Sequence, residues 1–321
     1  MLVAPLGVIS PAADAWIALI VAIAVLLVID LFIVRGRGGV MSLRLAAVAS
    51  VCWVAISVMF FAVLLFAGDP EDAKAYLAGY LVEKSLSLDN VFVFLLVFTA
   101  FAVPLEDRHR LLTYGIIGAL VLRLVFIVAG AAALNAFSWL AFFFAAILIW
   151  TGWRMFQHRH DHDAEKELVE KLAKRLPITT APPEGKLVTR ENGRRVLTAS
   201  GAALVGIAIV DLIFAVDSVP AILAITSDSF IVFAANAFAL LGLRPLFFLV
   251  AELVDRLYYL KTALAALLVF IGLKLIYGEL VGKVGPEYSL PVIAAILGAG
   301  VVASLVRNRR QTPSNPAHQE A

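Results

Sequence analysis

Charged residues, cysteine and histidine are all scarce in this sequence. Asp, Glu, Lys and Arg make up 16% of its 321 residues, whereas about a quarter is usual for a soluble domain. The one cysteine, Cys52, excludes an intrachain disulfide and a cysteine-based metal cluster. A net charge of +2 is too small to indicate a nucleic-acid partner. These shortages argue against a soluble, a disulfide-stabilised and a nucleic-acid-binding protein.

Sequence motifs of common enzyme classes are missing as well. The chain has neither the H-E-x-x-H motif of metalloproteases nor the G-x-S-x-G motif of serine hydrolases. The glycine-rich stretch GRGGV (36–40) lacks the lysine and serine that a phosphate-binding loop places after its glycines. We therefore predict that the protein is not an enzyme and that ATP does not drive it.

Apolar residues are abundant instead, at 62% of the chain with a mean hydropathy of +0.95. About twenty apolar residues in a row can cross a bilayer as a helix. The first such run is not preceded by the basic segment of a cleavable signal, so we expect it to be retained. The sequence predicts an all-α, polytopic membrane protein in the lipid bilayer with nine spans, at about 14–34, 43–67, 76–101, 111–134, 136–154, 199–225, 229–250, 258–277 and 289–306.

Basic residues are unevenly divided among the loops between these runs. Loops after the odd-numbered runs are rich in Arg and Lys, whereas those after even-numbered runs, such as GDPEDAK (68–74) and NAFS (135–138), are poor in them. Because Lys and Arg stay on the cytoplasmic side of a membrane, we expect an outside N-terminus and a cytoplasmic C-terminus.

Two stretches of the chain resemble each other. EKSLSLDNV (83–91) and DLIFAVDSV (211–219) each have an acid, an Asp six positions later, then Asn or Ser, then Val. The likeness continues between RLVF (123–126) and RPLF (244–247), and between TGWRMF (151–156) and IGLKLI (271–276). Three matches in the same order predict an internal duplication. By the loop charges the two three-helix units have opposite orientations, as in transporters with a midplane substrate site between inverted repeats.

The chain is accordingly expected to divide into five parts. These are two N-terminal helices (1–75), a first three-helix repeat (76–155), a cytoplasmic linker (156–198), an inverted second repeat (199–278), and a final helix with a cytoplasmic tail (279–321). Within the linker, DAEKELVEKLAKRL (163–176) has acid–base pairs four residues apart, which predicts a short amphipathic helix.

Each of the two like motifs places two carboxylates inside an apolar run, where a charged group needs a partner or a function. Four acids in two symmetric positions favour function over structural burial. An oxygen-rich pocket suits a hard divalent cation. The predicted metal ligands are Glu83, Asp89, Asn90, Asp211, Asp217 and Ser218.

Helical periodicity distributes these groups over two faces. Glu83 shares a face with Ser87 and Asn90, and Asp211 shares one with Ser218, while Asp89 and Asp217 lie off those faces. Either both faces meet protein or the helix is interrupted. Pro220 favours interruption in the second copy, because it leaves the carbonyl of Val216 without its helical partner.

The alternative is that the acids are purely structural. Arg123, Arg244 and Lys84 are available as partners, and because a cation does not bind a cation, we expect these three to balance charge. Structural acids would make the protein a non-transporting membrane scaffold in metal, tellurite or envelope-stress responses. The polar loop 155–198 is the best sequence support for that reading.

Three further features have two readings each. Asp30 lies near the end of the first run, and either snorkels to water or faces the cavity as a ligand. Asn236 is either a ligand or, as we favour, an interhelix hydrogen-bonding group. His158, His160 and His162 alternate with Asp161 and Asp163 and could collect metal, although such polar tracts are more often solvated linkers.

The two motifs, extended to EKSLSLDNVFVF and DLIFAVDSVPA, resemble those of the TerC family of bacterial membrane proteins, in particular its longer, Alx-like branch. The likeness covers about residues 16–307. It implies a protein of the bacterial cytoplasmic membrane, two inverted three-helix repeats as in LysE-type transporters, and a role in tellurium resistance or manganese export. It places the acidic motif positions at Glu83, Asp89, Asn90, Asp211 and Asp217, and adds Asp30 in IDLF.

Residue chemistry alone leaves manganese and calcium as comparable candidates for the cation. None of the five histidines lies in an expected span and no cysteine is near the motifs, which disfavours zinc and copper(I). Magnesium gives up its water reluctantly. The resemblance decides for Mn²⁺ and for export. Protons are the expected coupling ion, since the same carboxylates bind either, and we expect no permanently bound cofactor.

Overall fold

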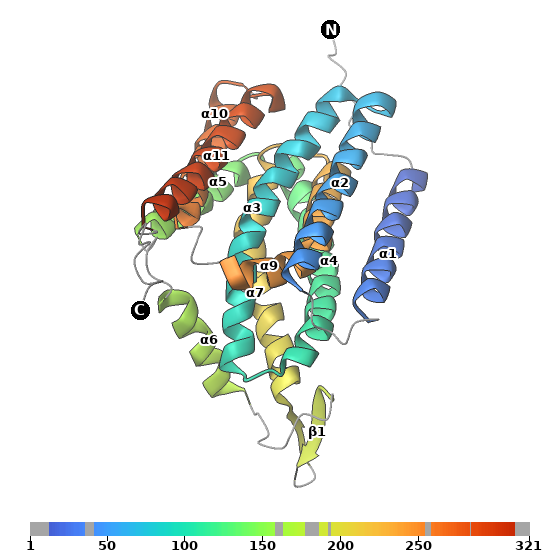
Figure 1. Ribbon diagram of the computed structural model, residues 1–321. Coiled ribbons are helices and arrows are strands. Elements are labelled where there is room, and N and C mark those ends of the chain that lie inside the picture. Colours follow the sequence, from blue (N-terminus) through green and yellow to red (C-terminus); the bar gives the residue numbers. More distant parts are fainter. Residues whose placement is uncertain are drawn as a thin grey trace, which may run out of the picture.

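The chain folds into a bundle of helices with one small β-hairpin at its end (Figure 1). The computed structural model describes residues 13–35, 42–157, 163–176, 186–191, 194–253, 258–282 and 284–311. Its elements are α1 (Ala13–Arg35), α2 (Leu43–Ala67), α3 (Pro70–Ala100), α4 (Leu105–Ala136), α5 (Leu140–Gln157), α6 (Asp163–Arg175), β1 (Val188–Glu191), β2 (Arg194–Leu197), α7 (Ala199–Leu223), α8 (Ser229–Leu241), α9 (Leu243–Leu253), α10 (Leu260–Leu280) and α11 (Pro286–Gln311).

Seven of the described helices are long and apolar enough to cross a membrane, and α8 with α9 makes an eighth if the pair is one bent span. These eight coincide with eight of the nine expected runs. The remaining run, 76–101, lies in the 31-residue α3, where Glu83, Lys84 and Asp89 interrupt the apolar sequence. The multi-pass helical membrane fold is therefore confirmed, whereas nine spans and their orientation stay predictions. The amphipathic α6 is found where the sequence predicts it.

Helix interruption occurs at a different place from the one that the sequence suggested. α7 continues through Pro220 to Leu223, which membrane helices tolerate because neighbouring groups satisfy the freed carbonyl. The break lies instead between α8 and α9, whose axes meet at a 41° bend. Gly242 lies at this break, and a Cβ atom there would lie 2.7 Å from Nζ of Lys84. A larger residue there would force the end of the Lys84 side chain to move.

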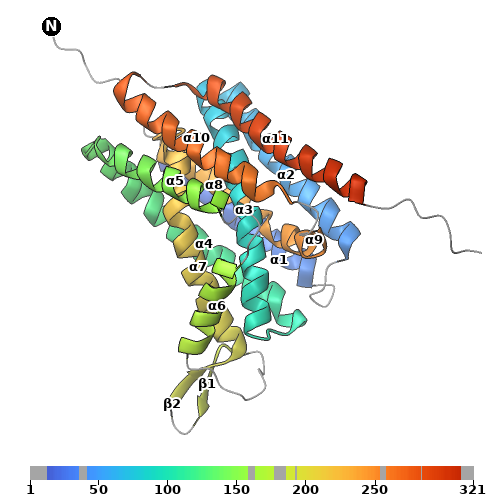
Figure 2. The ribbon, with the colours of Figure 1, turned by 90° about the vertical axis from the view of Figure 1, so that its left-hand side faces the viewer.

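The helices are arranged in two groups around a central set. Figures 1 and 2 show α3 and α7 running through the middle of the bundle, with α5, α10 and α11 on one side and α1 and α2 on the other. The hairpin β1–β2, paired from Val188–Leu197 to Glu191–Arg194, and α6 lie together at one end in both views. The polar residues of the candidate site lie on the central helices and their immediate neighbours.

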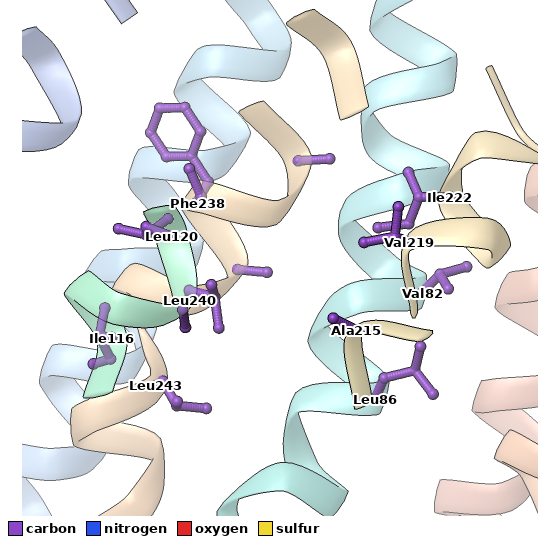
Figure 3. Close-up of a cluster of buried hydrophobic side chains, with 14 of the residues drawn as sticks. Val82, Leu86, Ile116, Leu120, Ala215, Val219, Ile222, Phe238, Leu240 and Leu243 are labelled. Carbon is purple, nitrogen blue, oxygen red and sulfur yellow. The ribbon is translucent and has the colours of Figure 1, made fainter. Parts of the chain in front are cut away.

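Buried apolar side chains hold the central helices together. Figure 3 shows Val82 and Leu86 of α3 facing Ala215, Val219 and Ile222 of α7, with a second group of side chains from α4, α8 and α9. All ten side chains labelled there are less than a tenth exposed. In a bilayer such contacts add dispersion and close packing rather than removal of area from water. They lie between the helices that carry the polar side chains described below.

Helix packing follows the pattern expected of two inverted repeats. α3 packs on α8 as α4 packs on α7, while α3 meets α7, α4 meets α8, and α5 lies along α10. A two-fold axis relating α3–α5 to α7–α10 would produce the same pairs. The duplication and the five-part division of the chain nonetheless stay predictions.

Where α5 and α10 cross, each helix places a glycine against a backbone carbonyl of the other. A Cβ atom on Gly152 would lie 2.8 Å from the carbonyl oxygen of Ala265, and one on Gly272 would lie 3.0 Å from that of Ala145. Each contact maps onto the other by a shift of 120 residues. Small residues of this kind let transmembrane helices approach closely.

We expect Gly152→Ala to destabilise the protein by roughly 1–3 kcal/mol, since the added methyl group must push the two backbones apart. Gly118→Ala in α4 is the matched control, because nothing lies within 4 Å of its Cβ position. That change should be neutral or stabilising, since alanine favours a helix by about 0.5–1 kcal/mol over glycine. Thermal unfolding of the two purified variants in detergent compares them, and equal melting temperatures would contradict the close crossing.

Candidate functional site

One buried arginine joins four helices at the centre of the bundle. Arg123 of α4 is fully buried. Its Nη1 donates to the carboxylate of Glu83 from α3 and, over 2.6 Å, to Oδ1 of Asn236 from α8. Its Nη2 donates to Oδ1 of Asp211 from α7 at 3.4 Å. A single guanidinium thus fixes α3, α7 and α8 to α4.

The charges in this cluster do not cancel. Two carboxylates, Glu83 and Asp211, face one guanidinium group. With both acids ionised, these three groups carry one excess negative charge, which the field of Lys84 on Glu83 partly offsets. Oε2 of Glu83 and Oδ2 of Asp211 are buried and have no hydrogen-bond partner among the described atoms. The hydroxyls of Ser87 and Ser218, on the same helix faces, are also buried and have no hydrogen-bond partner among the described atoms. Buried acceptors with excess negative charge are costly in a low-dielectric setting, and a cation or a proton would relieve both costs.

A second buried ion pair lies between α1 and α9. Nη1 of Arg244 lies 3.0 Å from Oδ2 of Asp30 and also donates to the backbone carbonyl of Asp30 over 3.1 Å. Nη2 donates to the hydroxyl of Thr113 from α4. Asp30 is only 4% exposed, so its carboxylate does not snorkel to water. It pairs with a different arginine from the one that holds Glu83 and Asp211.

Asp217 lies away from the Arg123 cluster. Its Oδ1 accepts a hydrogen bond from the hydroxyl of Thr151 in α5 over 2.9 Å. Six residues separate it from Asp211, which is about 9 Å along a helix and well round the axis. The structure thus realises the first of the two alternatives from the sequence, in which both faces of α7 meet protein.

Lys84 and Asn90 flank the cluster on α3. Nζ of Lys84 donates to the carbonyl oxygen of Ala239 over 3.3 Å, close to the break after α8. This carbonyl belongs to the last turn of α8, where the helix has no backbone donors left for its oxygens. Lys84 therefore neutralises a helix end, and its charge also acts on the adjacent Glu83. Asn90 is 3% exposed and shares the buried face of Glu83.

The predicted metal ligands do not all meet at one point. Among the residues that the structure describes, no three His, Cys, Asp or Glu side chains are close enough together to hold a metal ion. Asp89 lies in α3, but its side chain is outside the described part. The loop residues His158, His160 and His162 also lie outside it, as do Asp161 and the side chain of Asp163. Metal binding by these residues stays a prediction.

Two polar partners had received no role from sequence reasoning, and a third has the role that was favoured for it. Thr151 and Thr113 hold Asp217 and Arg244, respectively. Thr151 opens the motif TGWRMF, so its polar side chain within an apolar run was the available signal. Asn236 makes the interhelix hydrogen bond that was favoured over a ligand role, and it makes it to Arg123.

Comparison with known proteins identifies the family. Residues 68–312 match the model of the "Integral membrane protein TerC family". An uncharacterized membrane protein of Myxococcus xanthus is 41% identical over 302 residues, which are 94% of each chain. The "Putative membrane-bound redox modulator Alx" of Escherichia coli K12 is 37% identical over 303 residues, which are 91% of each chain. No solved structure matches. The resemblance predicted from the two acidic motifs is confirmed, and the chain belongs to the TerC family.

Proposed function

We propose that this TerC family protein is a secondary transporter that exports Mn²⁺ across the bacterial cytoplasmic membrane in exchange for protons. One observation carries the proposal: the Glu83–Arg123–Asp211 cluster is buried, joins the two halves of the chain, and has two carboxylate oxygens with no partner in the described part of the chain. A purely structural ion pair gains nothing from such open oxygens, because they add a desolvation cost without a bond.

The chemistry of the cluster suits a hard cation. Its acceptors are carboxylate and amide oxygens together with two serine hydroxyls, and the one cysteine is exposed on α2. Manganese and calcium both accept such ligands, and the family likeness supports manganese. The same carboxylates bind protons, so proton entry from one side and metal release to the other would use one set of oxygens.

Arg123 acts in this proposal as a built-in counter-charge. A divalent ion that binds Glu83 and Asp211 makes the guanidinium redundant, so its hydrogen bonds to the two acids must weaken as the ion enters. These bonds also fix α3 and α7 to α4, so loss of the bonds would free the helices to move against each other. The bent pair α8–α9 supports this view, since broken helices near the midplane are a recurrent feature of transporters.

Reconstitution of the purified protein in liposomes tests the proposal. With a proton gradient imposed, we expect Mn²⁺ to cross the membrane faster than in protein-free liposomes. Fe²⁺, Zn²⁺, Ca²⁺ and Mg²⁺ are run in parallel, and Mn²⁺ should be the fastest. Transport of Ca²⁺ alone would overturn the manganese assignment. Movement of no cation at all would overturn the transporter.

The second candidate is a non-transporting modulator or scaffold, which the name of the Escherichia coli relative favours. It predicts that no cation crosses the liposome membrane, and that removal of the loop 155–198 abolishes the cellular phenotype. A transporter predicts the opposite on both points. In cells, loss of a manganese exporter should raise cellular manganese and impair growth in excess manganese, and normal manganese content would favour the modulator.

A further inference from the structure

A cavity of about 310 Å³ lies at the end of the bundle opposite the β-hairpin. The last turns of α4, α7 and α10 line it, together with the first turn of α3 and the segment before α11. Under the predicted orientation this is the outer end. Neither the Glu83–Arg123–Asp211 cluster nor Asp217 contributes to its wall, so it is a separate feature of the molecule.

The wall of this outer cavity is rich in negative charge and oxygen. Asp72, Glu279 and Glu71 contribute carboxylates, and Thr226 and Ser227 contribute hydroxyls. Three helices also end there, and each C-terminal end carries a partial negative charge from its unpaired carbonyls. The carboxylate of Glu71 is already paired, 2.6 Å from Nζ of Lys74. No ion pair involving Asp72 or Glu279 occurs among the described residues.

Among the described residues that line the cavity, one carries a positive charge. Lys274 of α10 lines it and is only 8% exposed, and its Nζ has no hydrogen-bond partner in the described part of the chain. Glu287 of α11 is the carboxylate whose field acts on it, but no hydrogen bond joins the two. The Lys274 ammonium group therefore acts by its charge on any ion that enters the cavity.

We propose that the outer cavity is a second binding site for a hydrated divalent cation, and that the Lys274 ammonium group keeps the affinity of this site low. Six waters at about 30 Å³ each fill roughly 180 Å³, so an ion with its first water shell fits the cavity volume. The described acids do not converge as a three-ligand metal site, which is why the ion keeps its water. It would be held by charge and by hydrogen bonds from its waters to the wall.

Low affinity has a use on the outer side of an exporter. An ion that leaves the central cluster needs an attractive path outwards, yet it must not remain bound there. Asp72 and Glu279 supply the attraction, and the fixed positive charge of Lys274 opposes it by Coulomb repulsion. This role rests on the proposed export function, but binding to the cavity can be measured without any transport.

The test measures Mn²⁺ binding to the full-length protein in detergent, by the loss of the paramagnetic resonance signal of free Mn²⁺. We expect Lys274→Gln to tighten one class of sites by about tenfold or more, which corresponds to about 1.4 kcal/mol. The double variant Asp72→Asn, Glu279→Gln should lose that class. Lys171→Gln is the matched control for one lost positive charge, since its exposed ammonium lies on α6, and its binding should equal that of the parent.

Asp217→Asn separates this inference from the proposed function. We expect Lys274→Gln to tighten binding in that background too, even if transport in liposomes is absent for every variant. Unchanged or weaker binding on loss of the Lys274 charge would overturn the inference, as would full retention of the sites in the Asp72, Glu279 double variant. Should Lys274→Gln fold poorly, Lys274→Met serves instead, because it keeps the length of the side chain without the charge.

Discussion

Arg123→Gln is expected to lower the free energy of unfolding by about 3–5 kcal/mol, the range typical of a buried charge that loses its partner. Glu83 and Asp211 would then remain buried with no cation between them, and four helices would lose their common contact. We expect a sharply reduced yield of membrane-inserted protein and a much lower melting temperature in detergent. Arg190→Gln, on the exposed surface of β1, is the control and should have little effect.

Neutralising the whole cluster should undo much of this damage. In the triple variant Glu83→Gln, Arg123→Gln, Asp211→Asn, no charge is buried, and amide groups can hydrogen-bond to one another. Replacement of a complete buried ion cluster is often neutral or stabilising, whereas removal of one member is not. The triple variant should therefore melt near the parent while transporting nothing. If Arg123→Gln alone melts at the parental temperature, the ion pairs do not hold the helices together.

Much of the fold could be predicted because apolar length and loop charge are local properties of the sequence. α5 and α10, for example, were found from their hydropathy alone. α3 differs from the other expected spans, because Glu83 and Asp89, which the sequence proposes as ligands, also lower its apolarity. The break at Gly242 was not located from the sequence, which placed an interruption at Pro220 instead.

For the site, helical periodicity predicted which residues share a face of one helix, but it gave no information on contacts between helices. It predicted that Glu83 and Ser87 share a buried face and that Asp217 lies off the face of Asp211. It could not say which acid meets which base, because that depends on how the helices pack. From the sequence, either Arg123 or Arg244 could have paired with Asp30 or with Glu83. In the structure Glu83 pairs with Arg123, and Asp30 pairs with Arg244.

Asp217→Asn is expected to abolish Mn²⁺ transport while leaving the protein at least as stable as the parent. Unlike Glu83 and Asp211, Asp217 does not contact Arg123; it is held by the Thr151 hydroxyl and lies within the field of Arg154. Asparagine keeps an oxygen to accept that bond, so little structure is lost. The charge that would bind a cation or a proton is removed, however. Uptake of Mn²⁺ into everted vesicles should fall to the level of vesicles without the protein.

The contrast between activity and stability is what makes this variant decisive. If Asp217 served only to lock α7 to α5, Asp217→Asn would transport normally, and Thr151→Val, which removes the hydroxyl, would destabilise the protein as its main effect. Asp89→Asn, the equivalent change in the first motif, should also abolish transport if the repeats share one site. Glu167→Gln, which removes an exposed carboxylate on α6, should transport like the parent. Normal transport by both Asp217→Asn and Asp89→Asn would rule these residues out as ligands, because neither side chain would then need its charge.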